Sequence, residues 1–321
     1  MDDDQNARTP ERMDIVTVVY RADVALLKLQ ARSIRKFFRP RDIGTIIIAV
    51  NEMAPERTYS ALKDQVVEEY GELIRQVEIL PASHLMRPRV NASGWQTQQS
   101  LKVLVSSFVN AKHYLVLDAK HHFIRPVTIA NFLDRSSGKM RSFRLTSHGA
   151  LGVHLKSALE YFALEPREYT LPATAPYVML TSAARTLVSY VEDREQETFD
   201  DFMHQRGRQM TEFYLYYAFL EAQLGGADAH YKYGARGAVQ ISARHPSTQE
   251  KVDAALETLR EDKIVCFGLH KTRAPGLTES NVSVITDLWT TQGLFATTED
   301  ARAYFDTLLV DPTTHAILEN A

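Results

Sequence analysis

The chain has 321 residues, a formal net charge of −3 at pH 7 and one cysteine, Cys266. A weak negative net charge does not provide the basic surface that a nucleic-acid partner needs. One cysteine excludes an intramolecular disulfide framework and a Cys-based zinc cluster. The first residues are acidic and polar, unlike a signal peptide, and the longest apolar runs are strand-sized. We therefore expect a cytoplasmic protein with no intrinsic membrane anchor.

The first half of the sequence alternates strand-like with helix-like segments. The strands are apolar runs, and single helices separate them. This pattern predicts an α/β fold whose mostly parallel central sheet has helices on both faces. The predicted strands are residues 15–20, 45–51, 76–80 and 114–118, and the predicted helices are 22–38, 57–70 and 96–110.

The second half is less regular. Before its first predicted helix lies segment 171–180, in which Pro172 and Pro176 exclude a regular helix and predict a loop. No repeat or linker is visible, so we expect a flexible tail at residues 1–13 and a single domain over 14–321. The predicted strands are 142–146 and 264–270, and the predicted helices are 181–192, 211–223 and 298–309.

Ionisable and hydrogen-bonding residues follow several of these strands. In an open α/β sheet, ligands bind beyond the carboxyl ends of the strands, so chemistry is expected there. No glycine-rich phosphate loop of a known type follows any strand, so a phosphate ligand needs cationic side chains or a metal. The strand-end residues are Tyr20, Arg21, Asp23, Asn51, Asp118, Lys120, His270 and Lys271.

The predicted helix 96–110 and the residue before it carry a polar face. Trp95, Gln98, Gln99 and Lys102 are spaced so that they share one side. An indole, two carboxamides and an ammonium suit a nucleotide or a hydroxyl-rich ligand. A solvated helix face with one partly buried tryptophan explains the pattern equally well.

These motifs, in this order, resemble GT-A-type glycosyltransferases, which transfer sugars from nucleotide-activated donors. More narrowly, they resemble a bacterial glycosyltransferase-like family with little functional assignment. The resemblance implies a GT-A-like (Rossmann-like) fold, with a nucleotide-binding half at about 14–130 and an acceptor half at about 131–321. It rests on TVVYRAD (17–23), AVNE (49–52), GWQTQQSLK (94–102), YLVLDAKHHFIRP (114–126) and TEFYLYYAFLE (211–221).

The resemblance also implies roles for the strand-end residues. Such enzymes end the fourth strand in Asp-x-Asp, which holds a divalent cation on the donor diphosphate; here Asp118 is followed by Lys120. An ammonium stabilises a leaving phosphate directly, so we expect weak metal dependence or none. The alternative keeps Mn²⁺ or Mg²⁺ on Asp118 and His270. The expected donor-binding residues are Tyr20, Arg21, Asp23, Asn51, Trp95, Gln98, Gln99, Lys102, His270 and Lys271.

Glu212 is the candidate general base that takes the acceptor's proton, and with Asp118 and Lys120 it completes the expected catalytic set. Thr211 is the expected N-cap of helix 211–223, and a carboxylate at the first helical position is also favourable without catalysis. Tyr216, one turn later, and Tyr177 are the expected acceptor-binding residues.

Together, these features predict sugar transfer from a nucleotide-sugar donor to a hydroxyl of a glycan or glycolipid. The expected setting is surface polysaccharide or lipopolysaccharide biosynthesis in a bacterium, in the cytoplasm or at the inner membrane face. The alternative is a catalytically inactive protein of the same fold that binds nucleotide-sugars or glycans.

Overall fold

The computed structural model describes residues 11–52, 54–87, 94–146, 148–206 and 209–309. Most of the predicted tail, residues 1–10, lies outside this range. Met13, the last residue assigned to the tail, already begins the first strand of the sheet.

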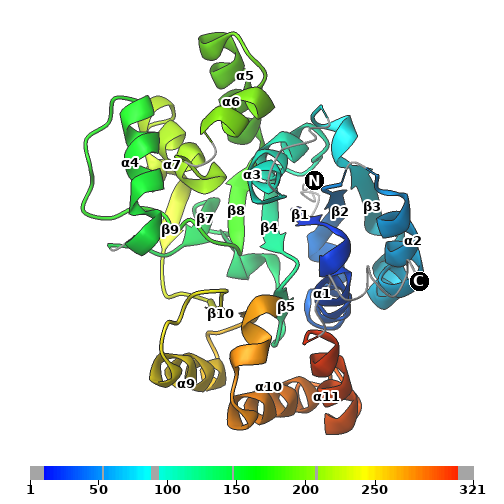
Figure 1. Ribbon diagram of the computed structural model, residues 1–321. Helices are drawn as coiled ribbons and strands as arrows, with labels where there is room; N and C mark the ends of the chain where they lie inside the picture. Colours follow the sequence, from blue (N-terminus) through cyan, green and yellow to red (C-terminus); the bar gives the residue numbers. More distant parts are fainter. Residues whose placement is uncertain (1–10, 53, 88–93, 147, 207–208, 310–321) are drawn as a thin grey trace, which may run out of the picture.

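The central sheet has five strands in the order β3-β2-β1-β4-β8 (Figure 1). The first four run parallel, whereas β8 is antiparallel to β4. The predicted α/β fold with a mostly parallel sheet is thereby confirmed. Part of the predicted loop 171–180 is wrong, because its last four residues form β8. The strands are β1 (Met13–Val19), β2 (Ile43–Val50), β3 (Val77–Pro81), β4 (His113–Asp118) and β8 (Tyr177–Leu180).

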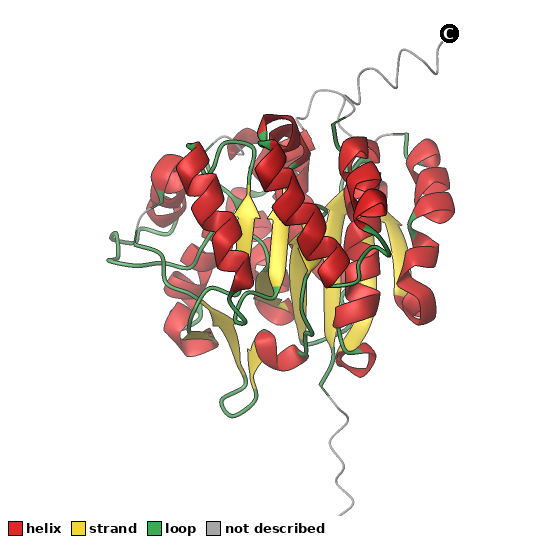
Figure 2. Cartoon of the chain, turned by 90° about the horizontal axis from the view of Figure 1, so that it is seen from below, coloured by secondary structure: helices red, strands yellow, loops and turns green. Residues whose placement is uncertain are grey.

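Helices cover both faces of this sheet, as the view in Figure 2 shows. On β1, the Thr17 hydroxyl donates a hydrogen bond of 2.7 Å to Gln30 on the first helix. The next residue, Val18, packs with Leu101 of the third helix. Because successive side chains of a strand point to opposite faces, these two helices lie on opposite sides.

Two smaller sheets extend the fold, with the orders β10-β11-β5 and β6-β7-β9. The predicted strand 142–146 is largely wrong: β7 ends at Ser142, and beyond it only an isolated bridge joins Leu145 to Thr170. A tight turn with Gly138 at φ 70° sets the pairing of β7 with β6 earlier in the chain. The strands are β5 (His121–Phe123), β6 (Leu133–Asp134), β7 (Lys139–Ser142), β9 (Tyr231–Tyr233), β10 (Ala238–Ile241) and β11 (Cys266–Leu269).

The predicted helices are present, but two of them end early. The predicted helix 96–110 stops at Leu104, where a short 3₁₀ segment, Val105–Ser107, follows. The predicted helix 57–70 ends early, because α2 gives way to a 3₁₀ segment, Val67–Gln76, in which Gly71 has a φ of 54°. The α-helices are α1 (Val24–Phe37), α2 (Glu56–Gln65), α3 (Gly94–Leu104), α4 (Gly152–Tyr161), α5 (Thr181–Glu195), α6 (Phe199–Arg206), α7 (Glu212–Gln223), α8 (Ala227–His230), α9 (Gln249–Glu257), α10 (Glu279–Thr291) and α11 (Thr298–Thr307).

One hydrophobic cluster includes buried residues from Met13 to Leu308, so both halves of the chain contribute to it. Within it, the Trp289 indole of α10 donates a hydrogen bond of 2.8 Å to His122 of β5. This contact holds the C-terminal helices against the small sheet that follows β4. None of the helices in the described ranges is both long enough and apolar enough to cross a bilayer.

Candidate functional site

Four charged side chains meet where β4 ends, and we call them the charge centre: Lys102, Asp118, Lys120 and Glu212. The Lys102 ammonium on α3 lies 2.9 Å from one carboxylate oxygen of Asp118 and 3.0 Å from Glu212. The Lys120 ammonium lies 2.6 Å from the other oxygen of Asp118. Lys102 and Glu212 are almost fully buried, whereas the Asp118 side chain is 27% exposed, so the charge centre runs from the interior to the surface.

The pKa values within the charge centre are set by burial and by these pairs. Burial opposes ionisation of Asp118, but the attraction of Lys102 and Lys120 holds its pKa well below the usual value. Burial also raises the pKa of Glu212, and Lys102 offsets this only in part. Burial disfavours the Lys102 ammonium, yet two neighbouring carboxylates raise its pKa. Lys102 therefore stays charged and pairs with an ionised Asp118.

Glu212 lies at the first position of α7, as predicted. Thr211 is the N-cap, and its hydroxyl accepts the backbone N–H of Tyr214 at 3.3 Å. The next residue, Phe213, has its ring centre 5.1 Å from the Lys102 ammonium. The helix start therefore surrounds this buried cation with a carboxylate and an aromatic face.

His121 connects the charge centre to the small sheet that contains β11. Its Nδ1 accepts the backbone N–H of Asp118 at 3.1 Å, and its Nε2 lies 3.3 Å from Oε1 of Gln240. Burial lowers the pKa of His121 to about 3, so the ring is neutral and the proton is on Nε2, donated to Gln240. Gly268 makes room for the ring, since a Cβ there would lie 2.7 Å from His121 Cδ2.

The first strand end is held by a lysine from the late part of the chain. The Lys271 ammonium donates to the Tyr20 hydroxyl at 2.7 Å and lies 3.3 Å from a carboxylate oxygen of Asp23. It also lies 4.5 Å from the centre of the Tyr20 ring. Burial raises the pKa of Asp23 to about 6, and Lys271 opposes this shift.

Two further predicted donor residues tie strand ends together through the backbone. The Asn51 amide donates a hydrogen bond of 3.0 Å to the carbonyl of Gly94 at the start of α3. The backbone N–H of Arg21 donates to the carboxylate of Glu52, next to Asn51. The ends of β1 and β2 and the start of α3 are thereby joined.

The predicted polar face of α3 runs from solvent to the charge centre. Trp95 is 44% exposed, Gln98 is half-buried, and Gln99 and Lys102 are buried. The solvated-face interpretation therefore holds only for the N-terminal end of this face.

His270 was the proposed partner of Asp118 in a metal site. Its Nδ1 lies 2.8 Å from the Thr272 hydroxyl, and burial, with Lys120 and Lys271 nearby, lowers its pKa to about 4. Both oxygens of Asp118 already bind ammonium groups, which repel a cation. The described residues contain no group of three or more His, Cys, Asp or Glu side chains that suits a metal ion. This set of donors does not fit Mn²⁺ or Mg²⁺.

The predicted acceptor residues Tyr177 and Tyr216 are both buried. Tyr177 stacks on Phe213 at 4.2 Å between ring centres. Tyr177 also lines a cavity, which is described next. The Tyr216 hydroxyl accepts the backbone N–H of Leu180 at 3.0 Å, so this side chain fixes β8.

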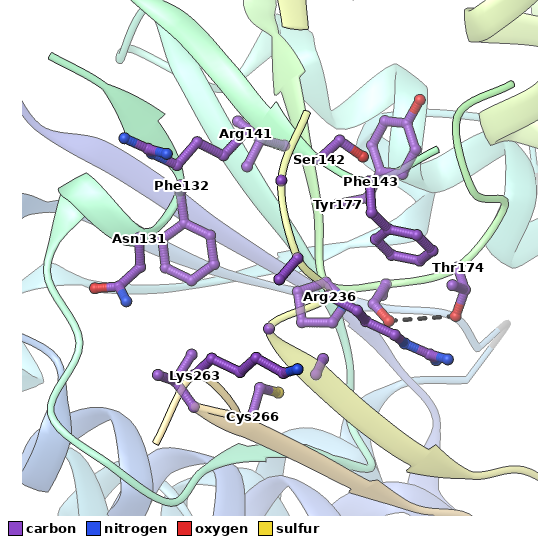
Figure 3. A pocket seen from close by; sticks show the side chains of 18 of the residues that line it. Asn131, Phe132, Arg141, Ser142, Phe143, Thr174, Tyr177, Arg236, Lys263 and Cys266 are labelled. Atoms are coloured by element: carbon purple, nitrogen blue, oxygen red, sulfur yellow. Dashed lines mark hydrogen bonds between the residues drawn. The ribbon is translucent and has the colours of Figure 1, made fainter. Parts of the chain in front are cut away.

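A cavity of about 330 Å³ lies where β8 meets the two small sheets (Figure 3). Its wall includes Gln240, which donates a hydrogen bond of 2.7 Å to Thr174. Of its lining, sequence reasoning identified only Tyr177 as a site residue, because the lining residues come from five separate segments of the chain. Its aromatic and cationic lining residues are Phe132, Phe143, Tyr177, Tyr231, Arg141, Lys232, Arg236 and Lys263.

Sequence reasoning also missed Gln30, which positions the end of β4. Its amide donates to the carbonyls of Asp118 at 2.8 Å and His121 at 2.9 Å. The sequence contained a signal for this role, because Gln30 falls on the apolar side of the predicted helix 22–38. A glutamine that is buried there needs hydrogen-bond partners inside the protein.

Comparison with known protein families matches residues 14–256 to a family described as "Family of unknown function (DUF6492)". The chain belongs to the DUF6492 family. Comparison with curated protein sequences finds no match.

Among solved structures, the DUF6492 chain is similar to the galactosyltransferase LgtC in complex with donor and acceptor sugar analogs. That match has a TM-score of 0.47 and 11% identity and covers 94% of this chain and 98% of LgtC. Mouse xyloside xylosyltransferase 1 matches with a TM-score of 0.43 and 10% identity, over 81% of this chain and 98% of that one. The glycosyltransferase GlyE of Streptococcus pneumoniae TIGR4 matches with a TM-score of 0.41 and 10% identity, over 94% and 61%.

Proposed function

We propose that this protein transfers a sugar from a nucleotide-activated donor to a hydroxyl group of a glycan or glycolipid. The observation that carries the proposal is the position of the charge centre. It lies at the carboxyl end of a parallel strand, where α/β sheets bind ligands. The end of β1 is near enough for the charges of Asp118 and Lys120 to act on the pKa of Asp23.

In the proposed reaction, the acceptor oxygen forms a bond to the anomeric carbon while the bond from that carbon to the donor phosphate breaks. Negative charge then develops on the leaving phosphate. Of the two lysines in the charge centre, Lys120 is the more exposed, at 15% against 7% for Lys102, and its ammonium stabilises that charge directly. Lys102 lies deeper and keeps Asp118 ionised, so that the aspartate holds Lys120 in place.

Glu212 is the proposed acceptor of the hydroxyl proton. A raised pKa suits a general base, because it brings the carboxylate closer to the working pH. Its side chain is only 2% exposed and is bound to Lys102. Acceptor binding therefore has to open a path to Glu212, with Lys102 turning further towards Asp118.

The proposed setting is bacterial surface polysaccharide or lipopolysaccharide biosynthesis, in the cytoplasm or at the inner membrane face. This part of the proposal rests on the motif resemblance, which implies an activated donor and a glycan or glycolipid acceptor.

A second candidate function is nucleotide-sugar or glycan binding without turnover. The covered position of Glu212 favours it, because a base with no access to the acceptor does no chemistry. Lysines bind both oxygens of Asp118, an arrangement that a protein which only binds its ligand also tolerates.

The first experiment is the melting temperature with UDP, GDP, CMP and dTDP and their sugars, each with EDTA or with Mn²⁺. A ligand at 100 times its Kd stabilises the fold by about 2.7 kcal/mol, which is readily measured. We expect a shift for one base class that persists in EDTA, and a smaller shift in Lys120→Gln. Lys156→Gln, an exposed lysine on α4, is the control. No shift with any nucleotide would end the donor-site proposal.

Turnover then separates the two candidates. For the transferase, Glu212→Gln abolishes transfer or donor hydrolysis while the nucleotide-induced melting shift remains. Binding of a donor without turnover of any donor and acceptor offered would favour the second candidate.

A further inference from the structure

The cavity between β8 and the two small sheets carries more positive charge than the protein itself neutralises. We infer that it binds an acidic sugar residue of the acceptor through the guanidinium of Arg236. This inference rests on the sugar-transfer function proposed above, and it names the class of acceptor: a glycan that carries a carboxylate or a phosphate.

The charge of the lining is the first observation. None of the residues that line the cavity is acidic, whereas four are cationic. Arg141 and Lys232 share one carboxylate, that of Asp134, at 2.7 and 2.9 Å. Lys263 pairs with Glu261 at 2.7 Å, outside the lining.

Arg236 is the cation without such a partner. In the part of the chain that the structure describes, its guanidinium makes no ion pair or hydrogen bond, and it lies 5.5 Å from the ring centre of Phe143. The residue is accessible to solvent, yet the surrounding protein lowers the pKa of its guanidinium by desolvation. Solvent access together with a lowered pKa is expected for a side chain inside a concave pocket, and Figure 3 shows Arg236 in the pocket. An accessible arginine fork in such a place suits a planar carboxylate or a phosphate.

The size and the remaining walls fit a sugar. A volume of about 330 Å³ is at the lower end of small-molecule sites, which have mostly apolar walls and a few placed polar groups. Phe132, Phe143 and Tyr177 supply aromatic surface for the C–H face of a sugar ring. Thr174 and Gln240 supply polar groups for its hydroxyls.

The cavity adjoins the charge centre through two of its walls. Gln240 contacts His121, which accepts the backbone N–H of Asp118. Tyr177 stacks on Phe213, whose ring also faces Lys102. One layer of side chains thus separates the cavity from the reacting groups. In this inference an acidic residue of the glycan occupies the cavity, and a neighbouring residue of the same glycan reaches Glu212 once acceptor binding has opened the path to it.

The test is calorimetric titration of the full chain, without nucleotide, with glucuronate, glucose 6-phosphate and uncharged glucose. We expect both or one of the acidic sugars to bind more tightly than glucose, and their order tells carboxylate from phosphate. Arg236→Gln weakens that binding by about tenfold or more. Arg260→Gln, an exposed arginine paired with Glu257, leaves it unchanged. Arg236→Lys gives an intermediate loss and replaces the glutamine variant if that variant does not fold.

Equal binding of glucose and the acidic sugars, no binding of any of them, or equal effects of Arg236→Gln and Arg260→Gln would overturn the inference. The nucleotide melting shift tests the proposed function separately and is expected to be the same in Arg236→Gln as in the wild type. If acidic sugars bind through Arg236 but no nucleotide binds, the proposed function fails, and the assignment of this ligand as an acceptor fails with it.

Discussion

The charge centre and the cavity both gather ionisable side chains, but they balance them differently. In the charge centre, Asp118 and Glu212 are each matched by an ammonium group within 3.0 Å. In the cavity, Arg236 stays unmatched among the described residues. A charge removed from water must be paired within the protein, whereas a charge that keeps contact with water does not need a partner. The comparison teaches that pairing keeps buried charges ionised and in place, whereas an accessible cation without a partner is available to pair with a ligand.

The largest expected effect comes from breaking the compensation. Lys102→Met leaves the buried Glu212 without its ammonium partner and the partly exposed Asp118 with Lys120 alone. We expect a loss of about 3–5 kcal/mol in the free energy of unfolding. Urea denaturation at pH 7 measures it. Lys156→Met, whose native side chain is 76% exposed, should change stability by less than about 0.5 kcal/mol.

A double variant sharpens this result. Because Lys102→Met leaves Glu212 buried and unpaired, Lys102→Met/Glu212→Gln should recover part of the loss. A loss of under about 1 kcal/mol in the single variant, or no recovery in the double one, would mean that water reaches these groups and that the charge centre is not closed.

The next effect concerns the link between the two regions. Gly268→Ala places a methyl group against His121 and within 3.3 Å of Gln240 Cβ, so we expect a loss of about 1–3 kcal/mol from overpacking. Gly276→Ala is the matched control, since nothing lies within 4 Å of its added Cβ. Urea denaturation compares the two. Equal stabilities would show that β11 and His121 separate easily and that the link is loose.

The smallest effect is a pH dependence at the edge of the charge centre. The folded pKa of Asp23 is about 6, above the value near 3.9 of an unfolded aspartate, so the folded state binds the proton more tightly. Its contribution to stability is therefore fully present below about pH 4 and is lost as the pH rises through 6. Between pH 5 and pH 7 this amounts to about 1 kcal/mol.

The measurement is the free energy of unfolding at both pH values for the wild type and for Asp23→Asn. The wild type should gain about 1 kcal/mol more than the variant when the pH is lowered from 7 to 5. Asp64→Asn, on the exposed side of α2, should behave as the wild type does. An identical pH dependence in all three proteins would mean that Asp23 titrates normally and that Lys271 dominates its surroundings.

Much of the central fold was predictable from the sequence. The strands β1 to β4 are short, mostly apolar runs between helices, and this local pattern is sufficient to predict a parallel sheet. Thr211 was predictable as an N-cap, because a threonine before an acidic first turn satisfies the free N–H groups of a helix. Strand β8 was not predictable, because Pro176 before it indicates a loop, and only pairing with β4 makes its four residues a strand.

The sequence by itself determined which residues end the parallel strands, and therefore that Asp118 and Lys120 lie together at the ligand-binding edge of the sheet. It also placed Lys102 on the polar face of α3. Only the tertiary structure decided that Lys102 reaches Glu212, 110 positions further along the chain, and that Arg236 faces a cavity without a carboxylate. The physical reason is that backbone periodicity is local, whereas charge compensation depends on which distant side chains the packing of the core brings within about 3–4 Å of each other.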